Sequence, residues 1–233
     1  MLSVRDLDVL YGRAQVLFGL SLEVGAGEVV ALLGRNGAGK STTLKAIMGL
    51  IRTARGAVTF EGRTLTGLAP NEIARLGVGY VPEDRRIFRD LTVAENLEVG
   101  RRPAPEGGLA WSPERLFELF PNLAELGRRR GGEISGGEQQ MLALARTLMG
   151  NPRLLLLDEP SEGLAPVIAE QLARSIVALK ARGLAVLLSE PNPHFAREVA
   201  DRAAVIEKGR IRYTGTTAEL MADEAARRSY LAV

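Results

Sequence analysis

The sequence predicts an α/β fold with a core of buried strands, an N-terminal antiparallel β region and an inserted helical lobe. Two short runs, 29–33 and 154–157, are apolar at every position, as expected for parallel strands that are covered on both faces. Residues 1–25 alternate between apolar and polar side chains, which is typical of strands with one exposed face. Residues 88–150 carry helical patterns, and we expect them to form the inserted lobe.

Glycines separate the elements of the first half of the chain. A glycine-rich turn follows the strand at 28–33, and a helix is expected over 40–48, where Gly49 is a stop signal. A short strand at 57–60 ends near Gly62. This strand, turn and helix form the framework for the first motif described below.

The rest of the chain alternates between helices and strands. A loop is expected at 101–108, and Ser112 then marks a helix start as the N-cap before Pro113. We expect one domain over 1–233, with one lobe formed by 1–87 and 151–233 and a helical lobe at 88–150. The later expected elements are helices at 138–149 and 166–181, strands at 154–157 and 185–188, and a hairpin of 203–206 and 211–213.

Composition narrows the class of protein. The 233 residues are 46% hydrophobic and 25% charged, which is ordinary for a globular protein. No run reaches the ~18 apolar residues that a membrane-spanning helix needs. The N-terminus lacks a signal-peptide pattern, and cysteine is absent, which excludes disulfides and thiolate metal sites. The net charge of +2 and the short basic clusters without aromatics predict no nucleic-acid partner.

Residues 34–41 read GRNGAGKS and fit the P-loop pattern GxxxxGK[ST]. The glycines let backbone N–H groups surround phosphates, and the helix near Lys40 adds the positive end of its dipole. Lys40 supplies a charge to the β- and γ-phosphates of ATP, and Ser41 offers a hydroxyl to Mg²⁺. We therefore expect ATP and Mg²⁺ as cofactors. The expected ATP contacts here are Gly34, Arg35, Asn36, Gly37, Ala38, Gly39, Lys40, Ser41 and Thr42.

The apolar run at 154–157 ends in two carboxylates, Asp158 and Glu159. They stand at the carboxyl edge of the strand, where α/β sheets bind ligands. Asp158 is expected to hold Mg²⁺, directly or through water. Glu159 is expected to be the general base that polarises the attacking water. The segment resembles a Walker B motif, and together with the P-loop it predicts ATP hydrolysis.

Residues 134–139 read ISGGEQ and closely resemble LSGGQ, the signature of the ATP-binding cassette (ABC) family. Small residues here expose backbone N–H groups at the start of a helix, which makes a second anion site. The resemblance implies two cassettes paired head to tail. Ser135, Gly136, Gly137 and Glu138 would then contact the ATP of the partner subunit. The resemblance to the ABC family covers essentially the full chain and implies a RecA-like P-loop NTPase core.

Other positions take their roles from this resemblance alone. Tyr11 stands where an aromatic residue stacks on adenine, and Glu83 stands at the Q-loop, where its oxygens would help to hold Mg²⁺. Residues 161–165 match the D-loop, with Ala165 in place of the usual Asp. ATP binding would close the pair of cassettes and hydrolysis would reopen it, driving membrane subunits on other chains.

Longer stretches resemble the cassettes of bacterial branched-chain amino-acid importers, to which urea and short-amide importers are closely related. The stretches are 80–88, 91–97, 135–141 and 158–166. This resemblance implies a peripheral protein at the cytoplasmic face of the inner membrane. Its partners would be a second ATPase subunit, identical or not, two transmembrane permease subunits and, indirectly, a periplasmic solute-binding protein.

One position departs from the subgroup as well as from the family. The switch histidine that contacts the γ-phosphate would fall at Pro191, which has neither a side-chain donor nor an N–H. Asn192 is a neighbour that could supply the contact, and His194 is a less favoured substitute. We hypothesise that this subunit's own ATP site hydrolyses more slowly than the site of its partner.

Three other classes of P-loop protein are alternatives to a transport ATPase. Soluble cassettes of DNA repair or translation usually carry coiled-coil insertions or two cassettes, for which 233 residues leave no room. The signature motif argues against a small-molecule kinase. Glu159 argues against a regulatory cassette that binds ATP without turnover, whereas Pro191 keeps that class open.

Overall fold

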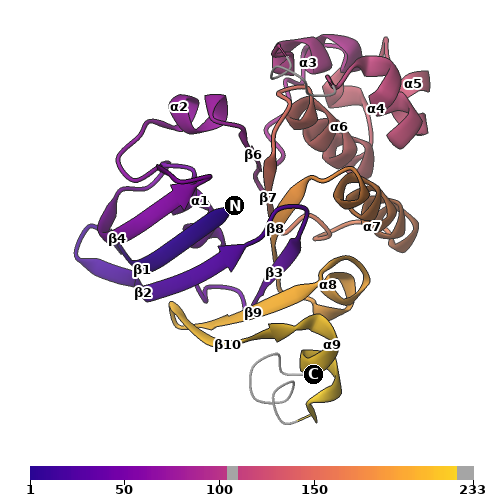
Figure 1. Ribbon diagram of the computed structural model, residues 1–233. Helices are drawn as coiled ribbons and strands as arrows, with labels where there is room; N and C mark the ends of the chain where they lie inside the picture. Colours follow the sequence, from indigo (N-terminus) through magenta and orange to yellow (C-terminus); the bar gives the residue numbers. More distant parts are fainter. Residues whose placement is uncertain (104–109, 225–233) are drawn as a thin grey trace.

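A computed structural model of the chain describes residues 1–103 and 110–224, which form two sheets and a group of helices (Figure 1). The smaller sheet is antiparallel, and in the larger sheet only β10 runs against its neighbour. The predicted α/β class is confirmed. The smaller sheet has the order β2 (Ala14–Val24), β1 (Leu2–Tyr11), β4 (Thr53–Phe60) and β5 (Arg63–Thr64). The larger has the order β10 (Arg210–Thr216), β9 (Arg202–Glu207), β3 (Val29–Leu33), β8 (Ala185–Glu190), β7 (Leu154–Asp158) and β6 (Val78–Val81).

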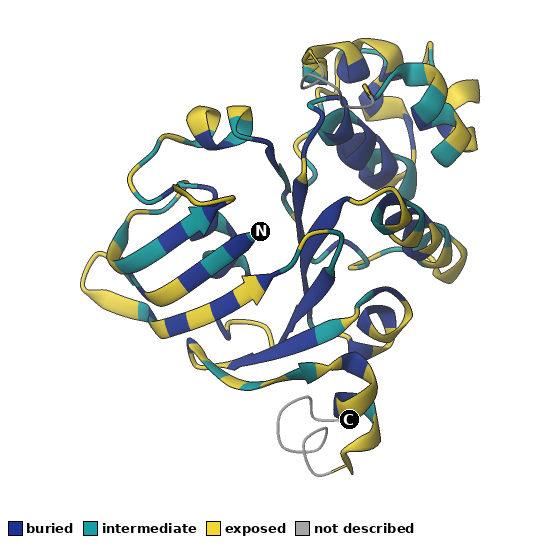
Figure 2. Cartoon of the chain, in the orientation of Figure 1, coloured by how far each residue is buried: buried dark blue, intermediate teal, exposed yellow. Residues whose placement is uncertain are grey.

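The three central strands of the larger sheet, β3, β8 and β7, are buried at every residue (Figure 2). Their side chains alternate between two apolar clusters, one on each face of the sheet. Val30 and Leu32 join the cluster shared with the smaller sheet, whereas Val29, Ala31 and Leu33 join the cluster shared with the helices. Burial on both faces is the reason that β3 is apolar at every position.

The smaller sheet and helix α1 (Lys40–Ile47) together cover one face of the larger sheet. β1 pairs with β2 so that buried Leu2 lies opposite buried Val24, as the alternating pattern predicts. Helix α1 contributes Leu44 and Ile47 to the same apolar cluster. Because α1 follows β3 directly, this packing fixes the turn between them.

The helical group lies beyond the other face of the larger sheet (upper right in Figure 1). Ser112 caps the second of its helices, and Leu116 and Phe120 are fully buried there, as expected. Of the expected loop 101–108, residues 104–108 lie outside the described residues. The group consists of α3 (Val93–Gly100), α4 (Pro113–Leu119), α5 (Pro121–Glu125), the 3₁₀ turn η1 (Gly131–Glu133) and α6 (Gly136–Leu148).

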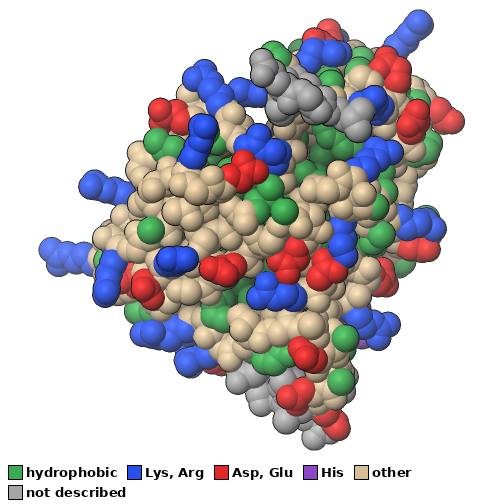
Figure 3. Space-filling view, in the orientation of Figure 1, with side chains coloured by type: hydrophobic (Ala, Val, Ile, Leu, Met, Phe, Trp, Pro, Cys, Tyr) green, Lys and Arg blue, Asp and Glu red, His purple; other side chains and the backbone are tan. Residues whose placement is uncertain are grey.

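Outside the helical lobe, five elements were not predicted, namely the strands β5 and β6 and the helices α2 (Pro70–Arg75), α8 (Pro193–Val199) and α9 (Thr217–Ala222). The three helices have seven residues or fewer, too few for a helical period to be visible, and neither strand is an uninterrupted apolar run. The predicted helix at 166–181 is α7 (Pro166–Ala181). None of the described helices is long and apolar enough to cross a bilayer. Acidic and basic side chains are interspersed on the face shown in Figure 3.

Candidate functional site

The P-loop is the turn between β3 and α1, and its glycines have steric reasons to be glycine. Gly39 caps α1 with φ 115°, a conformation that side chains disfavour. A Cβ on Gly34 would lie 2.3 Å from the carbonyl oxygen of Ile206 on β9. The loop therefore lies against the larger sheet with its backbone exposed to the other side.

The turn between β9 and β10 holds the P-loop from the side. The amide of Gly209 donates to the carbonyl of Ala38 at 2.8 Å, and the carbonyl of Gly209 accepts from the amide of Phe18 at 3.0 Å. A Cβ on Gly209 would lie 1.9 Å from the carbonyl oxygen of Val16. This glycine thus links the smaller sheet to the P-loop through backbone contacts that no other residue allows.

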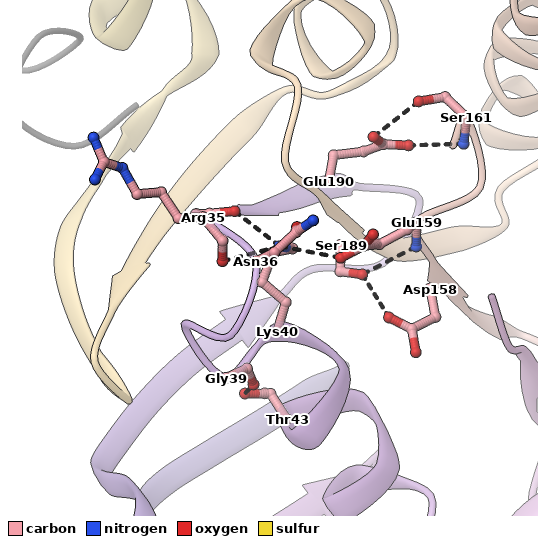
Figure 4. Close-up of polar contacts among 11 residues, drawn as sticks. Arg35, Asn36, Gly39, Lys40, Thr43, Asp158, Glu159, Ser161, Ser189 and Glu190 are labelled. Atoms are coloured by element: carbon pink, nitrogen blue, oxygen red, sulfur yellow. Dashed lines mark hydrogen bonds and ion pairs between the residues drawn. The ribbon is translucent and has the colours of Figure 1, made fainter. Parts of the chain in front are cut away.

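Lys40 lies at the centre of the site and is only 3% exposed. Its Nζ donates to the carbonyls of Gly34 and Arg35 at 2.8 and 3.2 Å, and to Oδ1 of Asn36 at 3.4 Å. The same nitrogen lies 3.1 Å from Oε1 of Glu159 (Figure 4). The P-loop lysine and the predicted general base therefore come from distant segments and meet as a buried ion pair.

Asp158 ends β7 and is 1% exposed. Its Oδ1 accepts from the hydroxyl of Ser189 at 2.8 Å, and its Oδ2 accepts from the hydroxyl of Tyr80 at 3.1 Å. Burial and the neighbouring Asp158 charge raise the pKa of Tyr80, so the phenol stays a donor. The Ser189 hydroxyl also accepts from the amide of Glu159 at 3.1 Å. Two neighbouring strands thus fix the carboxylate of Asp158.

These residues fit a Mg²⁺ ion that is held mainly by nucleotide phosphates. The described residues contain no group of three acidic or histidine side chains that could hold a metal alone. Mg²⁺ in phosphate sites usually takes one or two carboxylates together with phosphates and water. The buried Asp158 carboxylate and the Ser41 hydroxyl in the first turn of α1 are donors of that kind.

The signature residues lie at the start of α6, in the helical group. The hydroxyl of Ser135 accepts from the amide of Glu138 at 3.3 Å, and the carboxylate of Glu138 accepts from the amide of Ser135 at 2.7 Å. This capping box leaves Ser135 and Gly136 exposed. Within the described residues, no hydrogen bond or ion pair joins this segment to the P-loop.

Two further predicted residues are exposed, and within the described part of the chain neither forms a hydrogen bond with the P-loop. Tyr11 ends β1 and is 49% exposed, as an aromatic platform for a ligand would be. Glu83 is exposed on the loop after β6. The geometry therefore brings Lys40, Asp158 and Glu159 together, and shows no contact between them and Tyr11 or Glu83 within the described residues.

The structure adds site residues that sequence reasoning missed. Tyr80 and Ser189 hold Asp158, and Glu190 accepts from the amide and hydroxyl of Ser161 at 2.9 and 2.8 Å. The available signal was a polar pair, Ser189–Glu190, at the end of an otherwise apolar strand. The sequence does not show that β7 lies beside this strand, so the polar pair alone predicts no contact with Asp158 or Ser161.

The segment after β8 contains the unusual switch position. Pro191 follows Glu190 directly, and Asn192 caps α8, with its Oδ1 accepting from the amide of His194 at 2.9 Å. Asn192 thus has a local role at the helix start. The His194 side chain is exposed on α8.

Comparison with known proteins decides the family. The family description "ABC transporter" matches residues 17–162, more than half of the chain. The chain belongs to the ABC transporter ATPase family. This cassette is 45% identical over 231 residues to the high-affinity branched-chain amino acid transport ATP-binding protein BraG of Pseudomonas aeruginosa, covering 99% of both chains. It is 36% identical over 235 residues to the lipopolysaccharide export system ATP-binding protein LptB of Haemophilus influenzae, covering 99% and 97%.

Solved structures agree with this assignment. A nucleotide-free ATP-binding cassette from an ABC transporter superposes with a TM-score of 0.83 at 28% identity, covering 97% of this chain and 96% of the other. The ADP conformation of the ABC cassette MJ1267 gives 0.82 at 27% identity, with the same coverage. As a cassette of this family, the chain binds and hydrolyses ATP. The predicted family, fold and enzyme class are confirmed.

Proposed function

We propose that this cassette is the motor subunit of a bacterial importer for branched-chain amino acids. The observation that carries the proposal is the 45% identity to BraG over nearly the whole of both chains. The probable branched-chain amino acid transport protein LivF of Archaeoglobus fulgidus is 35% identical over 225 residues, 96% of this chain and 95% of the other. Urea and short amides are the alternative cargo.

Export is the second candidate function. It is favoured by the 36% identity to LptB, which is named for lipopolysaccharide export. The higher identity to BraG favours import. The transport experiment must therefore also distinguish import from export.

In the proposed ATP site, the P-loop backbone at 34–39 surrounds the phosphates, and Lys40 neutralises their charge. Ser41 and Asp158 would hold Mg²⁺, which would supply positive charge beside the phosphates. Glu159 accepts a proton from the attacking water. The meeting of Lys40 and Glu159 at 3.1 Å supports this assignment, because both groups must reach the same γ-phosphate.

The remaining contacts would come from the rim and from a second cassette. Tyr11 would stack on adenine, and Thr42, in the first turn of α1, would contact ATP. Glu83 would give Mg²⁺ another oxygen ligand. The signature at 135–138 would close over the ATP of the partner, since the N–H groups of Gly136 and Gly137 lie in the first turn of α6. We propose that residues 1–87 and 151–233 form the nucleotide-binding lobe of this single domain, and 88–150 the helical lobe.

A groove beside β6 supports docking of a membrane subunit. It has a volume of about 410 Å³ and is lined by residues of α2, β6, α3, α6 and neighbouring loops. Leu50, Phe88 and Val99 line it and are 45%, 47% and 57% exposed, although they are large and apolar. Asn96, fully buried, accepts from the amide of Phe88 and donates to its carbonyl, both at 2.9 Å, so the exposed ring is held in place.

The charge of the groove indicates the chemistry of its partner. Arg86, Arg102 and Arg146 line it together with the apolar side chains. The guanidinium of Arg146 lies 5.1 Å from the ring centre of Phe88. A short amphipathic helix with carboxylates, presented by a permease subunit at the cytoplasmic face of the inner membrane, would complement both features.

Transport is tested by deleting the gene in its source cells and measuring uptake of radiolabelled leucine, isoleucine and valine. We expect uptake to fall and to return with the wild-type gene but not with Glu159→Gln. Unchanged uptake of all three would contradict the proposed cargo. A defect confined to urea or amide uptake would favour the alternative cargo, and a defect in lipopolysaccharide export would favour the second candidate.

Docking is tested by pull-down of the tagged chain from native membranes. Phe88→Asp should reduce the amount of co-purified permease subunits while ATP binding stays unchanged. Val177→Asp, which changes an exposed apolar residue on α7, is the matched control. Equal recovery of permease with both variants would contradict docking at the groove.

A further inference from the structure

Glu190 is a buried acid for which the ATPase chemistry above has no use. It is the last residue of β8, between β3 and β7, and its exposure is 0%. In the register of the sheet, Leu33 lies beside it on β3. An ionised carboxylate at such a depth is costly unless hydrogen bonds satisfy it. The groups that donate hydrogen bonds to the Glu190 carboxylate are therefore needed to keep it buried.

Both hydrogen bonds to the Glu190 carboxylate come from Ser161. The amide of Ser161 donates to Oε1 at 2.9 Å and its hydroxyl donates to Oε2 at 2.8 Å (Figure 4). Ser161 lies in the loop 159–165, which leads from β7 to α7. The terminal side chain of β8 therefore holds this loop two residues after Glu159.

Glu159 lies between two anchors supplied by β8. On one side, the Ser189 hydroxyl accepts from the amide of Glu159 and donates to Asp158. On the other side, Glu190 holds Ser161. The φ of Glu159 is 47°, a strained value for a residue with a side chain. Such a conformation persists only where the surroundings impose it, and these two anchors do so.

We propose that Glu190 is a positioning residue for ATP hydrolysis, which acts through Ser161 to hold the backbone that carries Glu159. The inference rests on the proposed role of Glu159 as general base. It assigns to β8 a function that is independent of the switch position, where Pro191 offers no donor.

The charges around Glu190 make this anchor sensitive to pH. The pKa of Glu190 is raised to about 7, mainly by burial and also by the carboxylates of Glu159 and Glu162 on the neighbouring loop, while the two Ser161 bonds act to lower it. Lys40 faces Glu159 on the P-loop side. The ionised form accepts from both Ser161 groups. A proton on the carboxyl turns one oxygen into a donor and removes the charge that strengthens both bonds from Ser161, so we expect kcat to fall as the pH falls through about 7.

The test is steady-state ATPase activity of the tagged full chain, purified with its membrane partners, for Glu190→Gln, Ser161→Ala and the double variant. We expect Glu190→Gln to lower kcat by about tenfold, as loss of a charge-assisted hydrogen bond would, with the Kd for ATP unchanged. In Glu190→Gln, kcat should no longer fall as the pH decreases below about 7. Ser161→Thr, which keeps the hydroxyl, should retain most of the activity.

The double variant distinguishes action through Ser161 from an independent effect. If Glu190 acts through Ser161, the double variant should be about as slow as the slower single variant. Multiplicative losses, or a Glu190→Gln variant that keeps both kcat and the acid limb, would overturn the proposal. A change in uptake specificity alone would contradict the proposed cargo and leave this inference standing.

Hydrogen exchange of the full chain gives a readout that needs no turnover. The amides of residues 159–162 should exchange faster in Glu190→Gln than in wild type, and faster in wild type at acidic than at alkaline pH after correction for intrinsic rates. Unchanged exchange across this segment in the variant would also overturn the proposal.

Discussion

The ammonium nitrogen of Lys40 lies 3.1 Å from a carboxylate oxygen of Glu159, which joins the P-loop to the end of β7. Lys40 is buried and Glu159 is partly buried, so each charge benefits from the other as a partner. A γ-phosphate that binds Lys40 must compete with this carboxylate. Nucleotide binding would then release Glu159 toward the attacking water.

Glu159→Gln should therefore separate ATP binding from hydrolysis. The Kd for ATP should stay the same or fall, because a competing charge is removed from Lys40. Turnover should fall about 10²–10⁴-fold, the usual contribution of a general base. Calorimetric titration and phosphate release measure the two quantities. Glu162→Gln, on the same loop and exposed, is the control, and retained turnover in Glu159→Gln would remove Glu159 from its role.

Tyr80→Phe should weaken Mg²⁺ binding and leave the fold intact. The variant keeps the ring and removes the hydroxyl that donates to Asp158 at 3.1 Å. Loss of such a partner typically reduces metal affinity by 10–100-fold, so we expect about tenfold. Mn²⁺ binding in the presence of ATP, followed by electron paramagnetic resonance, is the measurement. Tyr213→Phe on β10 is the control, and equal affinities in the two variants would contradict the assignment.

Gly209→Ala should destabilise the protein and disturb the P-loop. The added Cβ would lie 1.9 Å from a backbone oxygen, and φ at this position is 75°. We expect the free energy of unfolding to fall by more than about 2 kcal/mol, the conformational cost plus a clash. Denaturant titration measures it. Gly62→Ala, at φ 77° with open space around it, should cost only about 1–2 kcal/mol, and an equal loss in both variants would exclude the clash.

Glu190 should also make stability depend on pH. Its pKa is raised from 4.5 to about 7, so the folded protein binds more protons than the unfolded chain between these values. The contribution of Glu190 to stability therefore becomes less favourable as the pH rises through this window. From about pH 5 to about pH 8, the free energy of unfolding of the wild type should fall relative to that of Glu190→Gln by up to about 3 kcal/mol. Parallel pH profiles of the free energy of unfolding for the wild type and Glu190→Gln would contradict this prediction.

Pro191→His should speed up this subunit's own ATP site, if the missing γ-phosphate contact limits it. A single donor to a developing negative charge is worth about 10²–10³ in rate. The measurement is ATPase activity of the assembled complex, with the partner's site inactivated. Asn192→His is the control, because Asn192 caps α8. No increase with Pro191→His would count against the slow-site hypothesis.

Local patterns were sufficient to predict the parts of the site that lie in one continuous segment. The spacing of glycines and Lys40 in 34–41 predicted a phosphate loop, and two carboxylates after an apolar run predicted the end of β7. Burial on both faces makes such strands apolar throughout, so they are visible in any sequence. Helix α8 was missed because seven residues hold no readable helical period, and β6 was missed because Gly79 interrupts its apolar run.

By itself, then, the sequence determined which residues can bind phosphate, hold Mg²⁺ and accept a proton, because those properties belong to single side chains and short spacings. Only the tertiary structure decided which of them meet. The strand order β3-β8-β7-β6 places Lys40, Glu190, Glu159 and Tyr80 at one edge of the sheet. That order depends on packing between distant segments, which no local pattern records. The Tyr80–Asp158 and Ser161–Glu190 contacts, and with them the proposed role of Glu190, follow from it.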